Sequence, residues 1–488
     1  MIAAGAALLV LVIGGGLWWA SRGSARPPIV AIDAVNGSPK AQQVARDLAV
    51  RLGTLQSARG DAFELVLDPK GADIVLRLDA QDGPDALRRD LTFESGRNHA
   101  IIWSTSLQQP PAKAGDLSQQ LTVTSQRVLS CALEALSDRK DHIDASTLKL
   151  YLTGCSRLED VFGLSQYDPA LDRLFEQVIA RAPHFEGAWA NLLAAESEIA
   201  RSPDTPAVVI DKLRGHISHA QKLGLAIGEL YAAKASLVPQ SDFLGVLDLY
   251  NHGIAAHPDD AFLYRLRSEQ WTRIGRMSDA IGDADQARQL DPLSPAVQDN
   301  YVSVLAYAGK IEAAYEQLRR AEAMWPKAQN IQNARYRLDL RYGNPTNALA
   351  AYRSGIVSGG EPAMEALIEA RIDPSPAKIQ RAIDAERVQY AQEPRYIAGL
   401  VQALAQFGRT DEAIDTMLHY KRLDALGFNA EVLFRPAMQS VWRNPRSMAA
   451  AAHLGFVHLW QKSGKWPDFC AEPQLKYDCK KEAAKYRV

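Results

Sequence analysis

Proline, glycine and alanine each recur every 34 residues in the middle of this chain. The three series are Pro258, Pro292 and Pro326; Gly275, Gly309 and Gly343; and Ala280, Ala314 and Ala348. A 34-residue period is the length of a helix–turn–helix unit that stacks on its neighbours as a solenoid. In such a unit glycine allows positive φ in the turn between the helices, alanine allows close packing, and proline ends the second helix because it has no N–H to donate. The shared period therefore predicts a mainly helical solenoid.

The residues between these positions resemble the tetratricopeptide-repeat family. The repeat 261–294 contains Tyr264, Trp271, Gly275, Ala280, Ala284, Ala287 and Pro292, and the repeat 295–328 contains Tyr301, Leu305, Gly309, Ala314, Leu318, Ala321 and Pro326. Further, more degenerate repeats are indicated by Phe175, Val178, Pro183, Trp189, Leu192, Gly343, Ala348, Tyr352, Leu400, Leu404, Gly408 and Ala413. The resemblance implies a solenoid over residues 138–427. Its phase is lost between residues 200 and 253, where Pro203 and Pro206 mark an insertion.

The first 26 residues contain a long apolar segment. Residues 2–20 carry no charged side chain, and a helix of that length spans about 30 Å, the thickness of a hydrocarbon core. Trp18 and Trp19 occupy the place of an interfacial aromatic belt. A cleaved signal peptide is the alternative, but no basic residues precede the segment and Trp18 fits poorly beside a cleavage site after Ala20. We therefore expect an N-terminal transmembrane helix, with residues 1–26 as anchor and linker.

The cysteines form two close pairs in the sequence, Cys131 with Cys155 and Cys470 with Cys479. Four cysteines allow three connectivities, and pairing between neighbours is the simplest. Buried thiols of a cytoplasmic protein are the alternative, whereas a zinc site fits less well without a CxxC motif or a nearby histidine. Arg22 and Arg26 favour a cytoplasmic body by the positive-inside rule, but disulfides favour an oxidising compartment. We give the cysteines more weight and expect a single-pass protein of the bacterial inner membrane with its body in the periplasm.

Residues 27–137 follow a different pattern from the solenoid. Apolar or alternating runs predict strands at 29–34, 63–67, 72–78, 87–94 and 100–105, and helical periodicity predicts helices at 41–55 and 117–136. This order, β-α-β-β-β-β-α, predicts a small α/β domain with a mixed sheet. The strands at 29–32 and 72–76, with Trp103 in the last strand, resemble the TolB amino-terminal-like domain that precedes tetratricopeptide repeats in many bacterial membrane regulators. Asp33 and Ala34 depart from that family, which usually has proline and phenylalanine there.

The stretch 428–488 has no repeat phase but is rich in large aromatic residues: Trp442, Phe456, Trp460, Trp466 and Phe469. A solenoid needs a cap over its last apolar face, and we expect a helical cap with a disulfide loop here; an aromatic ligand site is the alternative. Residues 464–470 resemble the tail of the same regulators, in which paired cysteines recur. Anchor, α/β domain, repeats and tail together resemble the periplasmic half of membrane-spanning winged-helix regulators of the cadaverine-operon activator type. Their DNA-binding domain precedes the membrane helix and is absent from this chain.

Motifs for chemistry are largely missing. The chain has no GxxxxGK[ST], HExxH, GxSxG or CxxC motif, and no GxGxxG after a strand. His216 and His219 are spaced like metal ligands, but no further ligand motif accompanies them, and surface histidines are the simpler interpretation. Ser146 and Lys149 fit the SxxK spacing of serine acylases without the other motifs of that chemistry. We therefore predict no enzymatic activity, no cofactor and no metal site.

The concave face of the solenoid offers a candidate binding site. In tetratricopeptide folds, positions 2, 5, 9, 12 and 13 of the first helix of each hairpin line that face. The resemblance places eight residues there: Arg265, Glu269, Arg273, Asp299, Tyr307, Asn333, Arg337 and Arg341. Four arginines on one surface fit a clamp for carboxylates, because a guanidinium can grip a carboxylate through two parallel hydrogen bonds. Solvated charges, partly neutralised by Glu269 and Asp299, are the alternative.

Composition agrees with a folded, mostly soluble protein. The chain has 488 residues, 47% of them apolar and 23% charged, with a net charge of −2. This balance gives no reason to expect a nucleic-acid partner. From the resemblance we expect a membrane-anchored periplasmic scaffold, divided into 1–26, 27–137, 138–427 and 428–488, that binds a protein or peptide in its groove. The alternative is the sensory half of a transmembrane transcription regulator that lacks its DNA-binding domain in this chain.

Overall fold

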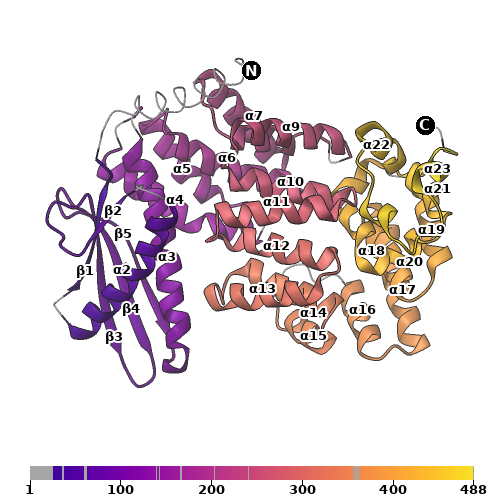
Figure 1. Ribbon diagram of the computed structural model, residues 1–488, viewed down its shortest axis with the longest axis horizontal. Helices are drawn as coiled ribbons and strands as arrows, with labels where there is room; N and C mark the ends of the chain where they lie inside the picture. Colours follow the sequence, from indigo (N-terminus) through magenta and orange to yellow (C-terminus); the bar gives the residue numbers. More distant parts are fainter. Residues whose placement is uncertain are drawn as a thin grey trace, which may run out of the picture. The chain divides into compact units, whose positions relative to one another are not determined.

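The computed structural model describes residues 26–35, 38–59, 63–138, 140–141, 143–164, 167–202, 204–239, 241–355, 357, 362–421 and 423–486. The chain divides into two compact units, Met1–Ala112 and Lys113–Val488. Figure 1 shows their strands and helices, coloured along the sequence.

The first unit contains a five-stranded mixed sheet with the strand order β2-β1-β3-β4-β5. Its elements are β1 (Ile29–Ala34), α2 (Pro39–Arg59), β2 (Glu64–Val66), β3 (Ile74–Asp82), β4 (Leu87–Ser95) and β5 (Ile101–Gln109), and the short helix η2 (Pro111–Lys113) follows. Strand β1 is parallel to both β2 and β3, whereas β3, β4 and β5 are joined as antiparallel neighbours. The mixed sheet and the order of its elements confirm the prediction from the alternating runs.

Apolar periodicity explains how helix α2 covers this sheet. Ala41, Ala45, Leu48 and Leu52 are spaced as one face of a helix and are all buried. On the sheet, β4 buries Leu87, Leu91 and Phe93, and the ring of Phe93 meets that of Trp103 on β5 edge to face at 5.6 Å. Helix α2 packs on β1, β2 and β3, and the alternation of period two puts the buried side chains of β4 on one face of the sheet.

The second unit consists of helices. Its longer helices are α3 (Ala114–Ser137), α4 (Ala145–Leu164), α5 (Pro169–Arg181), α6 (Glu186–Ala200), α7 (Ala207–Lys222), α8 (Glu229–Ser236), α9 (Phe243–Ala256), α10 (Ala261–Arg273), α11 (Met277–Leu290), α12 (Pro295–Tyr307), α13 (Ile311–Met324), α14 (Gln329–Arg341), α15 (Pro345–Arg353), α16 (Pro362–Ile372), α17 (Pro376–Gln392), α18 (Ile397–Gln406) and α19 (Thr410–Leu418). The C-terminal part adds η3 (Pro394–Tyr396), η4 (Leu423–Phe434), η5 (Pro436–Met438), α20 (Gln439–Trp442), α21 (Ser447–His453), α22 (Phe456–Ser463), η6 (Asp468–Ala471) and α23 (Cys479–Ala483).

The 34-residue period corresponds to the hairpins α10/α11, α12/α13 and α14/α15. Each repeated proline follows the end of the preceding second helix by two residues, and each repeated alanine is fully buried. Gly275 and Gly309 have φ of 80° and 76°, as the turn requires. Gly343 differs, because its φ is not positive; instead a Cβ there would overlap the hydroxyl of Tyr315. The third glycine of the series is thus required by close packing.

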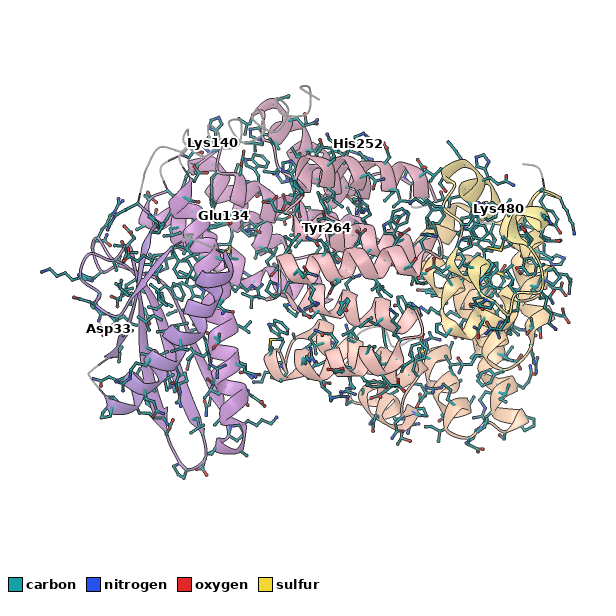
Figure 2. The ribbon with its side chains drawn as sticks, viewed as in Figure 1. Asp33, Glu134, Lys140, His252, Tyr264 and Lys480 are labelled. Carbon is teal, nitrogen blue, oxygen red and sulfur yellow. A yellow bond between two sulfur atoms is a disulfide. The ribbon has the colours of Figure 1, made fainter. Side chains whose placement is uncertain are left out.

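Side-chain pairs hold the two helices of a hairpin together. In the hairpin α10/α11, Arg267 donates two hydrogen bonds of 2.7 Å to the carboxylate of Asp283. The Arg267 guanidinium also lies 5.6 Å from the ring centroid of Tyr264, which is labelled on α10 in Figure 2. Trp271 donates to the same carboxylate at 2.9 Å. Arg267 and Trp271 therefore lie on the side of α10 that faces α11.

Helical packing continues through residues 200–253, where the sequence loses the repeat phase. Helices α6 and α7 pack together, and α8 packs on both α6 and α9. Pro206 is the residue before the first turn of α7, so it begins a helix and does not interrupt the stack. The expected insertion is therefore a hairpin of altered length, because a short α8 replaces a full-length first helix.

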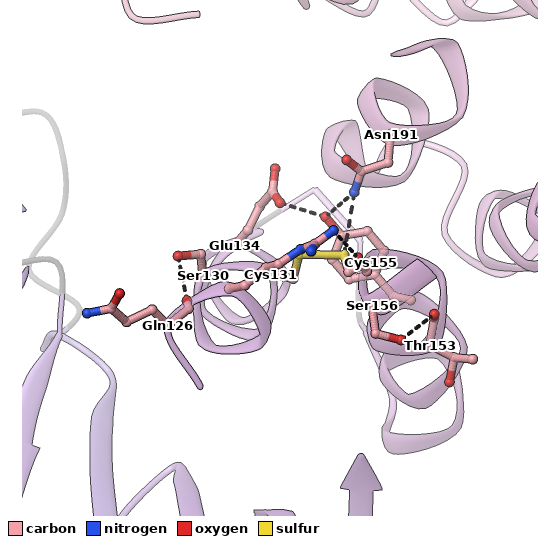
Figure 3. Close-up of a disulfide and its surroundings, with 10 residues drawn as sticks. Gln126, Ser130, Cys131, Glu134, Thr153, Cys155, Ser156 and Asn191 are labelled. Atoms are coloured by element: carbon pink, nitrogen blue, oxygen red, sulfur yellow. Dashed lines mark hydrogen bonds between the residues drawn. A yellow bond between two sulfur atoms is a disulfide. The ribbon is translucent and has the colours of Figure 1, made fainter. Parts of the chain in front are cut away.

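A disulfide joins α3 to α4 through Cys131 and Cys155 (Figure 3). Beside it, Tyr151 donates a 2.6 Å hydrogen bond to Glu134, and Asn191 of α6 donates to the Tyr151 hydroxyl at 3.0 Å. The second disulfide joins Cys470 to Cys479 in the C-terminal part. Helix α3, which the sequence assigned to the α/β domain, belongs to the second unit, where it packs on α4.

The C-terminal aromatic residues form a core and not an open site. Trp442, Phe456 and Trp460 are at most 3% exposed and pack against Phe243, Trp271 and Ile274 of the solenoid. The rings of Phe434 and Phe469 both stack on the ring of Trp442. The segment after α19 therefore shares a hydrophobic core with the repeats.

The predicted membrane helix requires a correction. Residues 2–20, on which the prediction rested, lie outside the described residues. Within the described ranges no helix is both long enough and apolar enough to cross a bilayer. The predicted fold class is corrected accordingly to a mainly helical solenoid with a small N-terminal sheet. The transmembrane anchor and the single-pass inner-membrane location with a periplasmic body are withdrawn with it.

Candidate functional site

A cavity of about 480 Å³ opens beside the first helices of three successive hairpins. Its lining includes seven of the eight residues placed on the concave face by sequence: Arg265, Glu269, Arg273, Asp299, Tyr307, Asn333 and Arg337. They come from α10, α12 and α14, where spacings of four and eight residues put them on one helix face. The eighth, Arg341, lines an adjoining cavity of about 160 Å³.

Arg265 lies at the centre of a four-charge network. It donates to Glu198 at 2.6 Å and to Glu269 at 2.7 Å. Arg201 contacts the same two carboxylates, at 3.3 Å from Glu198 and at shorter range from Glu269. Burial opposes ionisation of Glu198, but Arg265 and Arg201 outweigh it and lower the pKa of this carboxyl. These side chains form a fixed, nearly neutral wall.

The electrostatic environment of the Arg273 guanidinium is less favourable than that of Arg265. It is 8% exposed and donates to Gln270 at 3.3 Å. Burial, followed by repulsion from Arg201, lowers the pKa of the Arg273 guanidinium. Negative charge brought into the cavity near Arg273 would relieve this cost. Among the arginines that line the larger cavity, Arg273 is the one whose pKa is lowered.

Asp299 and Arg337 form an ion pair across α12 and α14. Ser303 also donates to Asp299, at 3.3 Å. Burial raises the pKa of Asp299 despite the attraction of Arg337. This ion pair neutralises Arg337, one of the four arginines of the predicted carboxylate clamp. The alternative interpretation included this neutralisation by Asp299.

The C-terminal part supplies a wall that the repeat pattern did not predict. Asn429, Glu431 and Arg435 line the larger cavity. Arg435 donates 3.1 Å hydrogen bonds to Glu431 and to the hydroxyl of Tyr307, and its guanidinium lies 4.4 Å from the Tyr307 ring centroid. Glu198 and Arg201 were missed as well, because they lie at the end of α6, where the phase is lost. Aromatic richness was the only sequence signal for the wall after α19.

The cavity combines five arginines with four carboxylates. These are Arg201, Arg265, Arg273, Arg337 and Arg435, with Glu198, Glu269, Asp299 and Glu431. Its formal charge is therefore +1, and the adjoining cavity adds Arg341. Such a surface can bind polar and acidic groups through charge-assisted hydrogen bonds. No cluster of three His, Cys, Asp or Glu side chains suited to a metal ion occurs among the described residues.

The two histidines considered as ligands both lie edge-on to the ring of Trp189 but differ in exposure. His219 is exposed, as the surface interpretation predicted. His216 is only 19% exposed, and its Nδ1 lies 2.9 Å from both carboxylate oxygens of the buried Glu196. Burial lowers the pKa of His216, but the contact with Glu196 reverses the direction and raises it. His216 therefore serves as the counter-ion of a buried acid.

The SxxK residues are also accounted for structurally. The Ser146 hydroxyl donates to Asp144 at 3.0 Å and accepts from Arg181 at 3.0 Å. Asp144 in turn accepts from the main-chain N–H of Thr147 at the start of α4. Ser146 thus belongs to a helix N-terminus and has an aspartate and an arginine as its partners.

Comparisons with known proteins add limited information. No protein-family description and no curated protein matches this chain. Among solved structures it is similar to the yeast Tom70 crystal structure, with 15% identity and a TM-score of 0.32 over 67% of this chain and 74% of that one. It is also similar to a chain of the Cut9–Hcn1 hetero-tetramer of the APC/C, with 12% identity and a TM-score of 0.35 over 76% of this chain and 84% of that one. Both are tetratricopeptide-repeat proteins, and the tetratricopeptide-like solenoid described above rests on its own hairpins and period.

Proposed function

We propose that this chain is a protein-interaction scaffold whose larger cavity binds an acidic segment of a partner protein. The observation that supports the proposal most is the convergence of five arginines from helices α6, α10 and α14 and from the C-terminal part around one cavity. A volume of about 480 Å³ falls within the range of specific ligand sites, roughly 300–1,000 Å³. The cavity can therefore enclose a few residues of an extended segment.

The paired arginines retain a role in this proposal. Arg265 is held in place by Glu198 and Glu269, so its guanidinium offers oriented donors at low entropic cost. Arg273 gains most from an added carboxylate, because its pKa is lowered by burial and by Arg201. Each charge-assisted hydrogen bond contributes about 1.5–3 kcal/mol. Two such bonds give a specific but reversible interaction.

The N-terminal unit enters the proposal only as a neighbouring domain. Its β-α-β-β-β-β order and its mixed sheet support the resemblance to a TolB amino-terminal-like domain. That resemblance assigns no ligand to the sheet. The binding role therefore stays with the repeats.

Defined peptide pools test the proposal even though the partner is unidentified. One fluorescent pool contains Asp and Glu at random positions, and a matched pool carries Asn and Gln instead. The full chain is compared with an Arg273→Gln/Arg337→Gln variant. The control is Arg320→Gln/Arg353→Gln, which removes the same charge from two arginines that are 65% and 57% exposed on α13 and α15.

The expected result is retention of the acidic pool by the wild type and by the control. The cavity variant should retain it at least about tenfold less strongly, the equivalent of 1.4 kcal/mol, and salt should weaken the wild-type interaction. Equal retention by both variants, or equal retention of the neutral pool, would remove the cavity from the proposed function.

A further inference from the structure

The smaller cavity differs in character from the larger one. It encloses about 160 Å³ between the ends of α12 and α14, helix α16 and Arg435. Most of its wall is apolar, from Ala306, Leu338, Leu340 and Met364 together with tyrosine rings. Ser303 and three arginines, Arg337, Arg341 and Arg435, complete the lining. An apolar chamber with cations in its wall is the usual form of a site for a small amphipathic anion.

Arg341 has no compensating acid at this position. Among the described residues, no carboxylate lies within ion-pair distance of its guanidinium; the nearby charged groups that act on it are Arg435, which repels, and the more remote Glu386. Burial, and then repulsion by Arg435, lowers the pKa of Arg341 to about 10. By contrast, Arg337 on the preceding turn pairs with Asp299. Positive charge therefore remains uncompensated on this wall.

Arg435 provides a second, independent observation. Its side chain is 10% exposed, and its terminal nitrogen Nη2 is engaged by Tyr307 and Glu431. Its Nε is buried and has no hydrogen-bond partner in the described part of the chain. Buried donors without partners are rare in folded proteins, and a bound ion or ligand is one of the standard explanations. Arg435 and Arg341 both line the smaller cavity.

We propose that the smaller cavity binds a small organic carboxylate, held by Arg341 and Arg435, whose short apolar or aromatic body packs against the tyrosine and leucine side chains. A carboxylate matches the geometry of guanidinium donors. Inorganic phosphate has no apolar part to pack against the apolar wall. A neutral compound would leave the positive charge of Arg341 without a counter-charge. This inference does not rest on the proposed partner site, because its ligand is a free small molecule.

Benzoate is a suitable probe, since it joins one carboxylate to one apolar ring. Isothermal titration of the full chain with benzoate should show saturable binding to one site. Benzamide, acetate and inorganic phosphate are the comparison ligands, and each should bind at least about tenfold more weakly. Arg341→Gln should weaken benzoate binding by a similar factor, whereas Arg353→Gln, on the exposed side of α15, should leave it unchanged. Circular dichroism and the unfolding midpoint of each variant establish that it is folded.

Four results would overturn the inference. These are the absence of saturation up to roughly 10 mM benzoate, equal binding of benzamide, equal binding of phosphate, and an unchanged affinity in Arg341→Gln. A short Ala-Leu peptide with a free C-terminus, compared with its amidated form, distinguishes the source of the carboxylate. If the free peptide displaces benzoate and binds more tightly, the ligand is a chain terminus and the proposal of a free organic acid is wrong. Arg337 lines both cavities, whereas Arg341 lines only the smaller one. Arg341→Gln should therefore weaken benzoate binding and leave binding of the acidic pool unchanged, which separates this inference from the proposed function.

Discussion

The indole Nε1 of Trp460 donates a 3.1 Å hydrogen bond to the main-chain carbonyl of Ile274, which lies 186 residues earlier. Ile274 is the residue after the last turn of α10, where helical carbonyls lack partners within the helix. The neighbouring turn is held from the same part of the chain, because the Asp468 N–H donates to Gly275 at 2.9 Å and Arg276 donates to the Trp466 carbonyl at 2.8 Å. The C-terminal cap thus fixes the end of a helix that lines the larger cavity.

Replacing Trp460 should release this contact. Trp460→Ala should lower the free energy of unfolding by about 3–5 kcal/mol, as for other fully buried aromatic residues. Trp460→Phe keeps much of the packing and should cost about 1–3 kcal/mol, mainly because the Ile274 carbonyl loses its donor. Urea unfolding measures both values. Val388→Ala, at a side chain that is 57% exposed, should change stability by less than about 0.5 kcal/mol; a Phe variant as stable as the wild type would argue against the hydrogen bond.

Local patterns predicted the repeats well because each repeated residue acts on its own neighbours in the chain. Gly275 and Gly309 occupy turns with positive φ, and Pro292 follows the end of α11. The same regularity predicted which helix face would carry Arg265 and Arg337. The role of Gly343 could not be predicted in this way, because it depends on the approach of Tyr315.

Long-range contacts set the limit of prediction for the cavity. Glu198 meets Arg265 across 67 positions, and Arg435 meets Tyr307 across 128. No periodicity connects such residues, so the sequence could predict the arginines and acids of the first helices but not Glu198, Arg201 and the wall after α19. The spacing of charged residues therefore indicated where the candidate site lies. Tertiary packing determines how much of its positive charge is neutralised by neighbouring acids.

The two disulfides should stabilise the helical unit. Cys131 and Cys155 are 24 residues apart, and Cys470 and Cys479 are nine apart. Loop-closure entropy predicts roughly 3 kcal/mol for each bond. Peptide mapping without reductant should recover both linked pairs, and dithiothreitol should lower the urea midpoint. A Cys→Ser replacement of all four residues gives the matched control, since its midpoint should not respond to dithiothreitol; four free thiols in the unreduced wild type would contradict the prediction.

Glu229 should make stability fall as pH rises. Burial, and then repulsion by Asp260, raises the pKa of Glu229 from 4.5 to about 8. The folded state therefore holds this proton more tightly than the unfolded state, and its stabilising effect is complete below about pH 4.5 and lost as the pH rises through 8. Glu229→Gln should flatten the dependence of the free energy of unfolding on pH between 4.5 and about 8. At pH 8 the substitution should stabilise the chain by about 1–3 kcal/mol. This is less than about 1.4 kcal/mol for each unit of the pKa shift would give, because the repulsion is shared with Asp260. Urea unfolding at pH 5 and pH 8 tests this, and equal pH slopes for wild type and variant would refute it.

Asp299 competes with an acidic ligand for Arg337. Its carboxylate already occupies that guanidinium, so Asp299→Asn should free Arg337 and tighten binding of the acidic peptide pool severalfold. Fluorescence anisotropy with the acidic and neutral pools measures the change. Asp285→Asn, which removes an acid that pairs with Arg288 on α11, is the matched control and should have no effect. Weaker binding in the Asp299 variant would show that this carboxylate positions Arg337 for the ligand and does not block it.

Arg341 and Arg337 should respond in opposite directions to the same substitution. Both lie on α14, one turn apart, but Arg337 pairs with Asp299, whereas burial and Arg435 lower the pKa of Arg341 to about 10. Arg341 is protonated at pH 7, and the cost of its charge persists at every pH below about 10. Arg341→Met keeps the apolar part of the side chain and removes that cost, so it should stabilise the unliganded chain by about 1–2 kcal/mol. Arg337→Met should destabilise it, because Asp299 loses its counter-ion. Urea unfolding at pH 7 without benzoate compares the two, and a destabilising Arg341→Met would show that its charge is already compensated in the folded chain.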